Sequence, residues 1–144
     1  MKTPVSLLLA AVALAGCGAI QKLEQKEPPP LPFTGTKWQV VLELPIPGEQ
    51  PWVRFGDGRM VGFGGCSQFA APILQDAVGA RAIAIKRIEL TQQGLCEASV
   101  VAAERQLLAK LQAVSAYAIR VDVMKMSGTG GTLVFRAVSL EAHR

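Results

Sequence analysis

The chain has 144 residues, of which half are apolar and 18% are charged, a composition typical of a single globular domain with short tails. The formal charge of +4 comes from 15 Lys and Arg scattered among 11 Asp and Glu. Because no basic run is interleaved with aromatic residues, nothing in this pattern indicates a nucleic-acid partner.

Residues 1–16 have the pattern of a signal peptide. Lys2 precedes an apolar run at 5–14, which is shorter than the roughly 20 residues that span a bilayer. The string Leu-Ala-Gly-Cys then ends at Cys17 and resembles the lipobox of bacterial lipoproteins. This resemblance implies cleavage before Cys17 and acylation of that residue, so the membrane is the expected partner. The alternative is an ordinary secretory signal with an incidental cysteine.

Gly18 follows the lipobox, where an aspartate usually retains a lipoprotein in the inner membrane. The rule implies an outer-membrane anchor with the domain facing the periplasm. Residues 17–33 are predicted to be a lipidated N-terminus and tether, because prolines 28–30 favour extended polyproline II. The fifteen residues from Gly18 to Pro32 reach at most about 50 Å when fully stretched. A proline-rich recognition motif is the alternative.

Residues 34–138 are predicted to form the folded domain, and 139–144 a C-terminal tail. The first half of the domain contains short runs that are rich in β-branched or aromatic residues or alternate with period two. We therefore expect strands at 37–44, 52–55, 59–63, 70–74 and 82–88. Asp57 and Gly58 are expected to form a hairpin turn, because this pair readily supplies positive φ angles.

A helix is predicted over 98–112, because apolar residues recur there at helical spacing. Glu104 falls on the same apolar stripe. It is either a functional carboxylate or, as we favour, a structural group that pairs with an arginine or accepts hydrogen bonds from backbone amides. Strands at 117–124 and 132–137, joined by a glycine-rich turn at 127–131, complete an α+β order whose antiparallel sheet curls around or against the helix.

Several residues in this order carry a family resemblance: Trp38, Phe55 to Arg59, Gly62, Gly65, Cys66, Phe69, Thr91, Cys96, Glu104 and Leu111. The set resembles the META domain, or HslJ, family. The resemblance implies a curved, partly open, barrel-like antiparallel sheet packed on one long helix, in an envelope protein without established catalysis and linked to stress tolerance. Ser67 stands where the family usually has Asn, which puts the local turn in question because Asn adopts left-handed conformations more easily.

Cys66 and Cys96 form an even pair in a chain that we expect to reach an oxidising compartment. A disulfide between them would clamp the start of the helix to the sheet. A metal site and a redox pair are the alternatives. The first needs more ligands than the pair and His143 supply, and the second usually has closely spaced cysteines.

No catalytic, cofactor-binding or metal-ligating residue is predicted. Residues 62–65 lack the Lys-Ser/Thr of a phosphate loop and are expected to form a bend. Glu97 and Glu104 are separated by about 10 Å of helix, too far for a side-by-side acid-base pair. Trp38 and Trp52 are expected in the sheet core rather than in a ligand groove.

The leading function is a noncatalytic, membrane-tethered module that binds an envelope protein, a peptide or a lipid. An exposed sheet edge would accept a strand, and an apolar interior would accept an acyl chain. The alternatives are a structural stress factor without a defined ligand and an enzyme that uses Glu104. The oligomeric state does not follow from the sequence.

Overall fold

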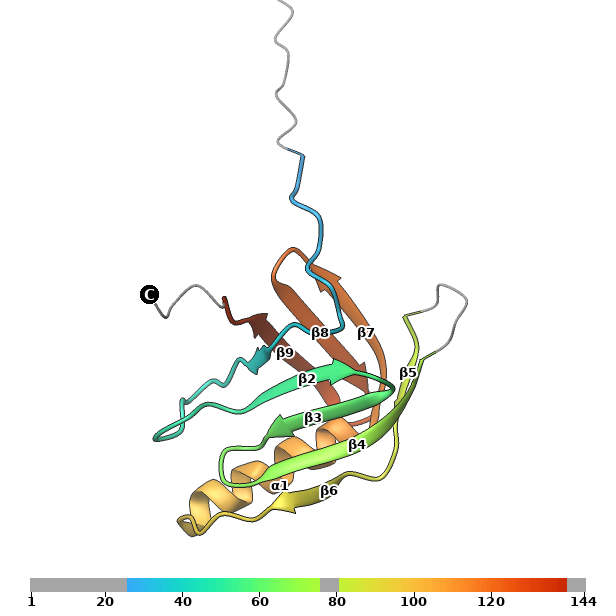
Figure 1. Cartoon of the computed structure of the whole chain (residues 1–144). Helices are drawn as coiled ribbons and strands as arrows, with labels where there is room; N and C mark the ends of the chain where they lie inside the picture. Colours follow the sequence, from blue (N-terminus) through green and yellow to red (C-terminus); the bar gives the residue numbers. More distant parts are fainter. Residues whose placement is uncertain (1–25, 76–80, 140–144) are drawn as a thin grey trace, which may run out of the picture.

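Nine antiparallel strands and one helix make up the part of the chain that the computed structural model describes, residues 26–75 and 81–139 (Figure 1). They follow one another as β1 (Trp38–Val40), β2 (Trp52–Gly56), β3 (Arg59–Phe63), β4 (Gln68–Gln75), β5 (Ile83–Ile85), β6 (Glu89–Gln92), α1 (Ala98–Gln112), β7 (Val114–Arg120), β8 (Val123–Gly128) and β9 (Gly131–Ala137). No described helix has the length and hydropathy of a membrane span.

The strands curl into a nearly closed barrel in the order β5-β4-β3-β2-β1-β9-β8-β7. Its first and last strands meet through a bridge between Ala82 and Ala116 and through the Tyr117 amide, which donates to the Arg81 carbonyl at 2.9 Å. Strand β6 lies off this path and pairs with the first half of β4, while β5 pairs with its second half. The α+β class and the curved antiparallel sheet are as predicted.

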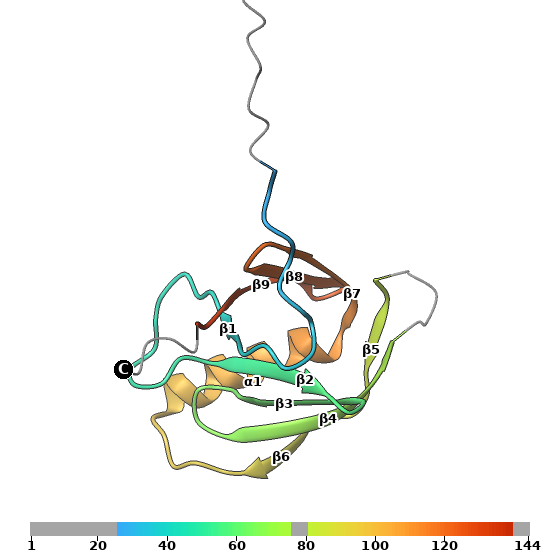
Figure 2. The same cartoon turned by 45° about the horizontal axis from the view of Figure 1, so that its top comes forward.

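Helix α1 packs against the inside of this curved sheet (Figure 2). Its buried face carries Glu104, Leu107 and Leu111, and both leucines belong to the hydrophobic core. The rest of the interior is filled by fully buried large side chains: Trp38, Phe55, Phe69, Phe135, Met60, Met124 and Met126. The alternation of inward and outward residues along β2 and β3 supplies part of this core.

The N-terminal segment lies against the barrel before residue 34. The Leu31 amide donates to the Val121 carbonyl at 2.8 Å, and the Phe33 ring stacks on the rings of Phe55 and Tyr117 at 4.1 and 4.5 Å. Glu27 pairs with Arg120. The last residues of the expected tether therefore pack against the domain. Phe33 stacks on Phe55 of β2 and on Tyr117 of β7.

Several predicted elements match closely. Helix α1 has the predicted bounds, and β2, β3 and β9 lie within a residue of expectation. Asp57 and Gly58 form the two-residue turn between β2 and β3, with φ angles of 52° and 69°. The predicted strand at 37–44 shortens to β1, since the residues beyond Val40 leave the sheet for the proline-containing loop.

Two predicted strands are wrong in their extent. The single strand expected at 82–88 is β5 alone, and the separate strand β6 follows it unforeseen. The strand expected at 117–124 is two strands, because the chain reverses at Val121 and Asp122 between β7 and β8. Val121 has a φ of 55°, a conformation that β-branched residues rarely adopt, so no local turn signal marks the reversal.

The signal peptide, Cys17, the expected turn at 76–79 and His143 lie outside the described residues. The predictions that rest on them stay predictions.

Candidate functional site

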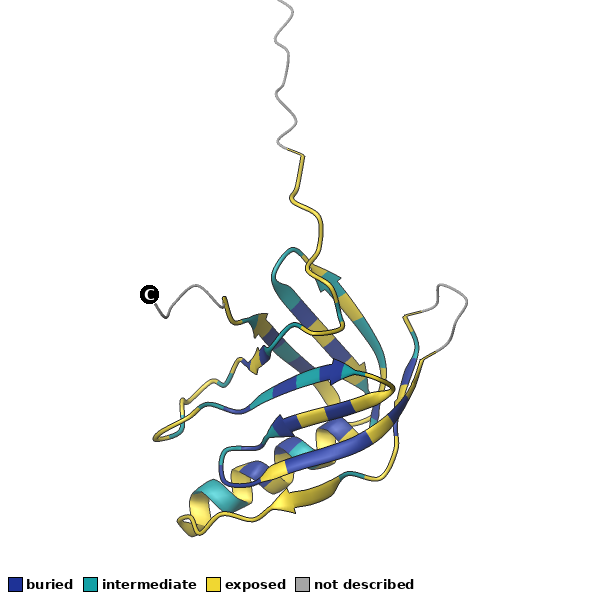
Figure 3. Ribbon diagram, in the orientation of Figure 1, coloured by how far each residue is buried: buried dark blue, intermediate teal, exposed yellow. Residues whose placement is uncertain are grey.

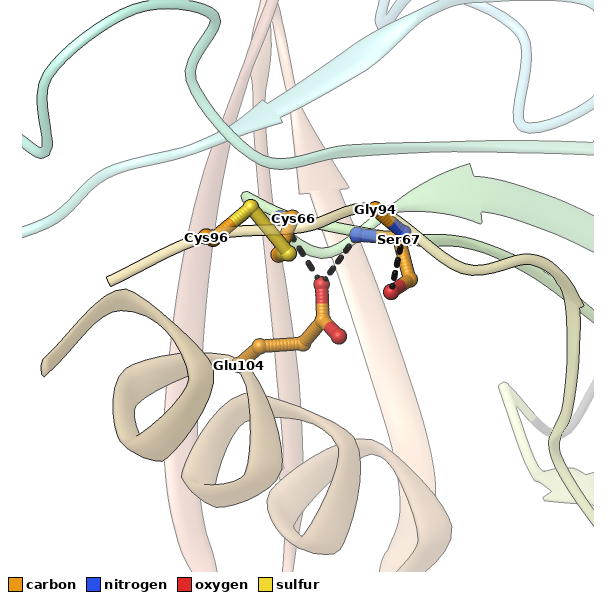
Figure 4. The surroundings of a disulfide bond; sticks show 5 residues. All are labelled: Cys66, Ser67, Gly94, Cys96 and Glu104. Carbon is orange, nitrogen blue, oxygen red and sulfur yellow. Dashed lines mark hydrogen bonds between the residues drawn. A yellow bond between two sulfur atoms is a disulfide. The ribbon is translucent and has the colours of Figure 1, made fainter. Parts of the chain in front are cut away.

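The buried carboxylate of Glu104 holds helix α1 against the loop between β3 and β4 (Figure 4). Its side chain is only 5% exposed. One oxygen, Oε2, accepts hydrogen bonds from the backbone amides of Cys66 at 2.8 Å and Ser67 at 2.6 Å. This is the amide-capping form of the structural role expected for Glu104. The residue therefore stabilises the packing of the helix on the sheet.

Glycines leave the space that this contact needs. A Cβ atom at Gly64 would lie 2.7 Å from Cγ and Oε2 of Glu104, and one at Gly94 would overlap the Cys66 carbonyl. Gly65 has a φ of 113°, which turns the loop so that the next two amides face the helix. The adjacent glycines thus form the expected bend, and they do so around a carboxylate.

Ser67 fits this loop without a left-handed conformation, since its φ is not positive. Its amide donates to Glu104, and its hydroxyl accepts from the Gly94 amide at 3.3 Å. The departure from the family's usual Asn therefore leaves the turn geometry to Gly65.

Cys66 and Cys96 form a disulfide, as predicted, with their Cα atoms 5.9 Å apart. Cys66 is buried beside Glu104, and Cys96 precedes the helix on an exposed segment. The helix begins at Ala98 after Glu97, whose side chain makes no capping hydrogen bond. The disulfide thus secures a helix start that lacks a side-chain cap.

A groove of about 480 Å³ runs between helix α1 and strand β6. Its helix wall contains Val101, Arg105, Leu108 and Ala109, and its other wall contains Ile88, Leu90, Gln93 and Gly94. Glu104 lines the groove as well. Its second oxygen, Oε1, accepts no hydrogen bond from the described residues and points away from the two amides in Figure 4.

A set of contacts at each end fixes the walls of this groove. At one end, Gln112 donates to the carbonyls of Ile85 and Lys86 at 2.8 Å and accepts from the Ile88 amide at 3.0 Å. At the other end, the disulfide and the Ser67–Gly94 hydrogen bond hold the segment after β6. The groove is therefore a fixed part of the fold, because these contacts hold β6 beside the helix.

Strand β6 is an edge strand. Within the described chain its backbone pairs with β4 only, and all four of its residues are exposed (Figure 3). Ile88 and Leu90 face the groove, whereas Glu89 and Thr91 line a separate depression on the opposite side. This alternation is what a strand shows to its two faces. The free edge offers unpaired backbone groups to another extended chain.

The two tryptophans have different places. Trp38 is fully buried in the core, as expected. Trp52 was expected there as well, but it lies half-buried on the outer face of β2, where its Nε1 donates to Glu49 at 2.8 Å. The alternation of side chains along β2 explains this difference, because Val53 and Phe55 take the inward-facing positions of that strand.

Sequence reasoning found Cys66, Cys96 and Glu104. It did not find the hydrogen bonds of Glu104 to the loop amides, of Ser67 to Gly94, or of Gln112 to the segment before β6. The spacing of a strand residue and a helix residue does not reveal a hydrogen bond between them. Only the β-compatible residues Leu90 and Thr91 hinted at β6, too short a signal beside Gln92 and Gln93. In the described part of the chain, no three His, Cys, Asp or Glu side chains gather to hold a metal ion.

The sequence profile of the META domain matches residues 31–139, more than half of the chain. The chain belongs to the META domain family. The match begins three residues before the expected domain start, at the segment where Leu31 and Phe33 already contact the barrel. No curated protein matches this META domain chain.

Solved structures share the fold of this META domain protein. An NMR structure from Burkholderia xenovorans is 15% identical, with a TM-score of 0.58 over 96% of this chain and 99% of that one. A DUF4847 family protein from Bacteroides vulgatus is 13% identical, with a TM-score of 0.53 over 72% and 93%. Another NMR structure is 12% identical, with a TM-score of 0.56 over 74% and 92%. At these identities the likeness concerns the fold alone.

Proposed function

We propose that this META domain protein is a noncatalytic envelope lipoprotein that binds an extended peptide segment of another envelope protein. The peptide would pair with the free edge of β6 and place alternate side chains in the groove beside α1. The observation that carries this proposal is the unpaired edge of β6 beside a groove of about 480 Å³.

The groove walls suit such a ligand. Ile88, Val101 and Leu108 supply apolar surface at half-buried positions, and Leu90 is exposed enough to gain burial when a peptide covers it. Backbone pairing gives affinity that is largely independent of sequence, and the groove supplies side-chain selectivity. An acyl chain is a weaker choice, because the barrel interior is filled by Trp38, Phe55 and the other core side chains.

The proposed anchor and location rest on the sequence. Acylation of Cys17 would attach the chain to the outer membrane, and residues 18–26 would link the anchor to Glu27. Glu104 is assigned a structural role because its buried oxygen is occupied by two backbone amides. A stress-related role without a ligand is the competing proposal, and it requires no partner at β6.

The experiment is site-specific photocrosslinking in intact cells that make the full lipoprotein. A photoreactive residue replaces Leu90 in the groove or, as the control, Val61 on β3, since these side chains are equally exposed at 42% and 41%. We expect a discrete adduct at Leu90 only, mapped by mass spectrometry to one extended peptide. That peptide, synthesised alone, then binds the purified protein. In the same cells, labelled palmitate enters the wild type and not Cys17→Ser.

A matched pair of variants ties the adduct to the groove. Ala109→Arg fills the groove from an exposed helix position that lines it, whereas Ala103→Arg adds the same side chain to an exposed position outside it. We expect Ala109→Arg to reduce the Leu90 adduct about tenfold or more and Ala103→Arg to leave it unchanged. Equal adducts in both variants, or none in the wild type, would favour the ligand-free stress factor.

A further inference from the structure

Two basic side chains share one indole ring on the outer face of the barrel. Lys37, just before β1, places its Nζ 4.7 Å from the centroid of the Trp52 ring, and Arg54 places its Cζ 5.7 Å from the same centroid. Trp52 and Arg54 stand two residues apart on β2 and so face the same side. The fold thus brings two positive charges to one aromatic ring.

These charges are only partly compensated. Glu49 accepts from Trp52 and lies 3.8 Å from the Lys37 ammonium, a long and exposed ion pair. Arg54 makes no ion pair or hydrogen bond with another described residue, and its Nε is buried without a partner. Buried donors in folded proteins usually have an acceptor, so the buried Nε of Arg54 is an exception that calls for an explanation.

Lys37 and Arg54 both line a pocket of about 560 Å³. Asp122 also lines it, and its carboxylate forms a long, exposed ion pair with Arg136 at 3.6 Å. Thr34 contributes to the wall as well. Lys37 and Arg54 outnumber the one carboxylate that lines the pocket, so its net charge is positive.

The pocket also lies where the N-terminal segment joins the barrel, because Leu31 and Pro32 form part of its wall. The segment from Cys17 to Leu31 spans at most about 50 Å when extended. A lipid attached at Cys17 would thus keep this pocket within reach of a bilayer surface.

We propose that Arg54 and Lys37 form a binding site for a phosphate group, carried either by a phospholipid headgroup or by free inorganic phosphate. A guanidinium supplies the fork of donors that matches phosphate oxygens, and an ammonium adds a second charge-assisted contact. Phosphate oxygens would give acceptors to a guanidinium that makes no ion pair or hydrogen bond with another described residue. The site is separate from the groove beside β6, so either proposal stands without the other.

The test is calorimetric titration of the full-length lipoprotein in neutral detergent micelles. One arm adds inorganic phosphate, and the other adds short-chain phosphatidylglycerol, with short-chain phosphatidylcholine as its zwitterionic comparison. We expect saturable binding in at least one arm. Binding of phosphate alone assigns the site to the free anion, and binding of phosphatidylglycerol alone assigns it to the headgroup.

Variants decide whether the site is the one proposed. Arg54→Gln and Lys37→Gln each remove a charge in the pocket, and Arg59→Gln removes one from an exposed position elsewhere on β3. We expect the first two to weaken binding about tenfold or more, the loss expected for one charge-assisted hydrogen bond, and Arg59→Gln to change it less than twofold. Arg54→Lys should retain more affinity than Arg54→Gln. Unchanged thermal unfolding excludes loss of fold. Equal losses in all variants, or no binding in either arm, would overturn the proposal.

Discussion

The two backbone amides that face Glu104 make its burial on an apolar helix face tolerable. A carboxylate that leaves water needs hydrogen bonds to replace its hydration, and the Cys66 and Ser67 amides provide them. The amides depend equally on the carboxylate, since both residues are buried and these donors have no other acceptor among the described residues. Glu104 and the loop therefore stabilise each other.

We predict that Glu104→Ala lowers the free energy of unfolding by about 3 kcal/mol, because it leaves two buried amides without an acceptor. Glu104→Gln keeps an acceptor oxygen of the same reach, and it should lose less than half as much. Urea denaturation of the three proteins measures both values. Equal stability of the wild type and Glu104→Ala, together with a lost activity, would instead support the enzyme alternative.

For this residue the sequence predicted both the position and a structural role. Helical spacing places residue 104 on the apolar stripe, and a carboxylate buried there needs hydrogen-bond partners. Its partners were not predictable. They belong to a loop almost 40 residues earlier, and that loop presents its amides only because Gly65 adopts a φ of 113°. A backbone angle of this kind is set by tertiary packing, which a single sequence does not display.

At the scale of elements, helix α1 is secured at its start by the covalent bond between Cys66 and Cys96. Glu104, Leu107 and Leu111 hold its middle and end to the core. These attachments act on different states. The side chains stabilise the folded helix, whereas the disulfide mainly restricts the unfolded chain.

We predict that the double variant Cys66→Ala/Cys96→Ala still folds but loses about 3 to 4 kcal/mol of stability, the chain-entropy value for a separation of 30 residues. Circular dichroism should show the helix retained, and urea denaturation should show the loss. Wild-type protein treated with a reductant serves as the control, because it removes the cross-link without a substitution. A double variant as stable as the oxidised wild type would show that the cross-link adds nothing.

The predicted elements succeeded where the local pattern was strong, as in α1 and in the hairpin of β2 and β3. They failed where tertiary contacts decide. Strand β6 exists because β4 is long enough to pair with two strands along one edge. The reversal at Val121 has no glycine or asparagine to mark it, and pairing of β7 with β8 holds that residue in its unusual conformation.

For the whole molecule, the barrel is completed by a segment that the sequence assigned to the tether. The order of strands and helix was enough to predict a curved sheet around a helix. The docking of residues 27–33 was not predictable, because a run of prolines indicates an extended chain and not what the chain lies against. Phe33 holds this segment on the barrel, because its ring stacks on the rings of Phe55 and Tyr117. A chain leading to a lipid at Cys17 would therefore depart from the barrel near Arg120, at the end of β7.

The outermost contact of this segment should respond to pH. Glu27 accepts hydrogen bonds from the Arg120 guanidinium at 2.6 and 3.1 Å. These hydrogen bonds, with the arginine's charge, lower the pKa of Glu27 below its ordinary value of 4.5. A lowered folded-state pKa means that the pair stabilises docking fully above the ordinary value and is lost as pH falls through the lowered one. Both side chains are exposed, so the effect is small and weakens with salt.

We predict that the Leu31 amide, which donates to the Val121 carbonyl, loses protection from hydrogen exchange roughly a few-fold on acidification through the Glu27 pKa. Rates are divided by the intrinsic rate at each pH, and the Tyr117 amide, bonded to Arg81 within the barrel, is the internal control. Glu27→Gln should show the lower protection at every pH, because it lacks the charge that Arg120 binds. If wild type and Glu27→Gln exchange alike at neutral pH, Leu31 and Phe33 hold the segment without the ion pair.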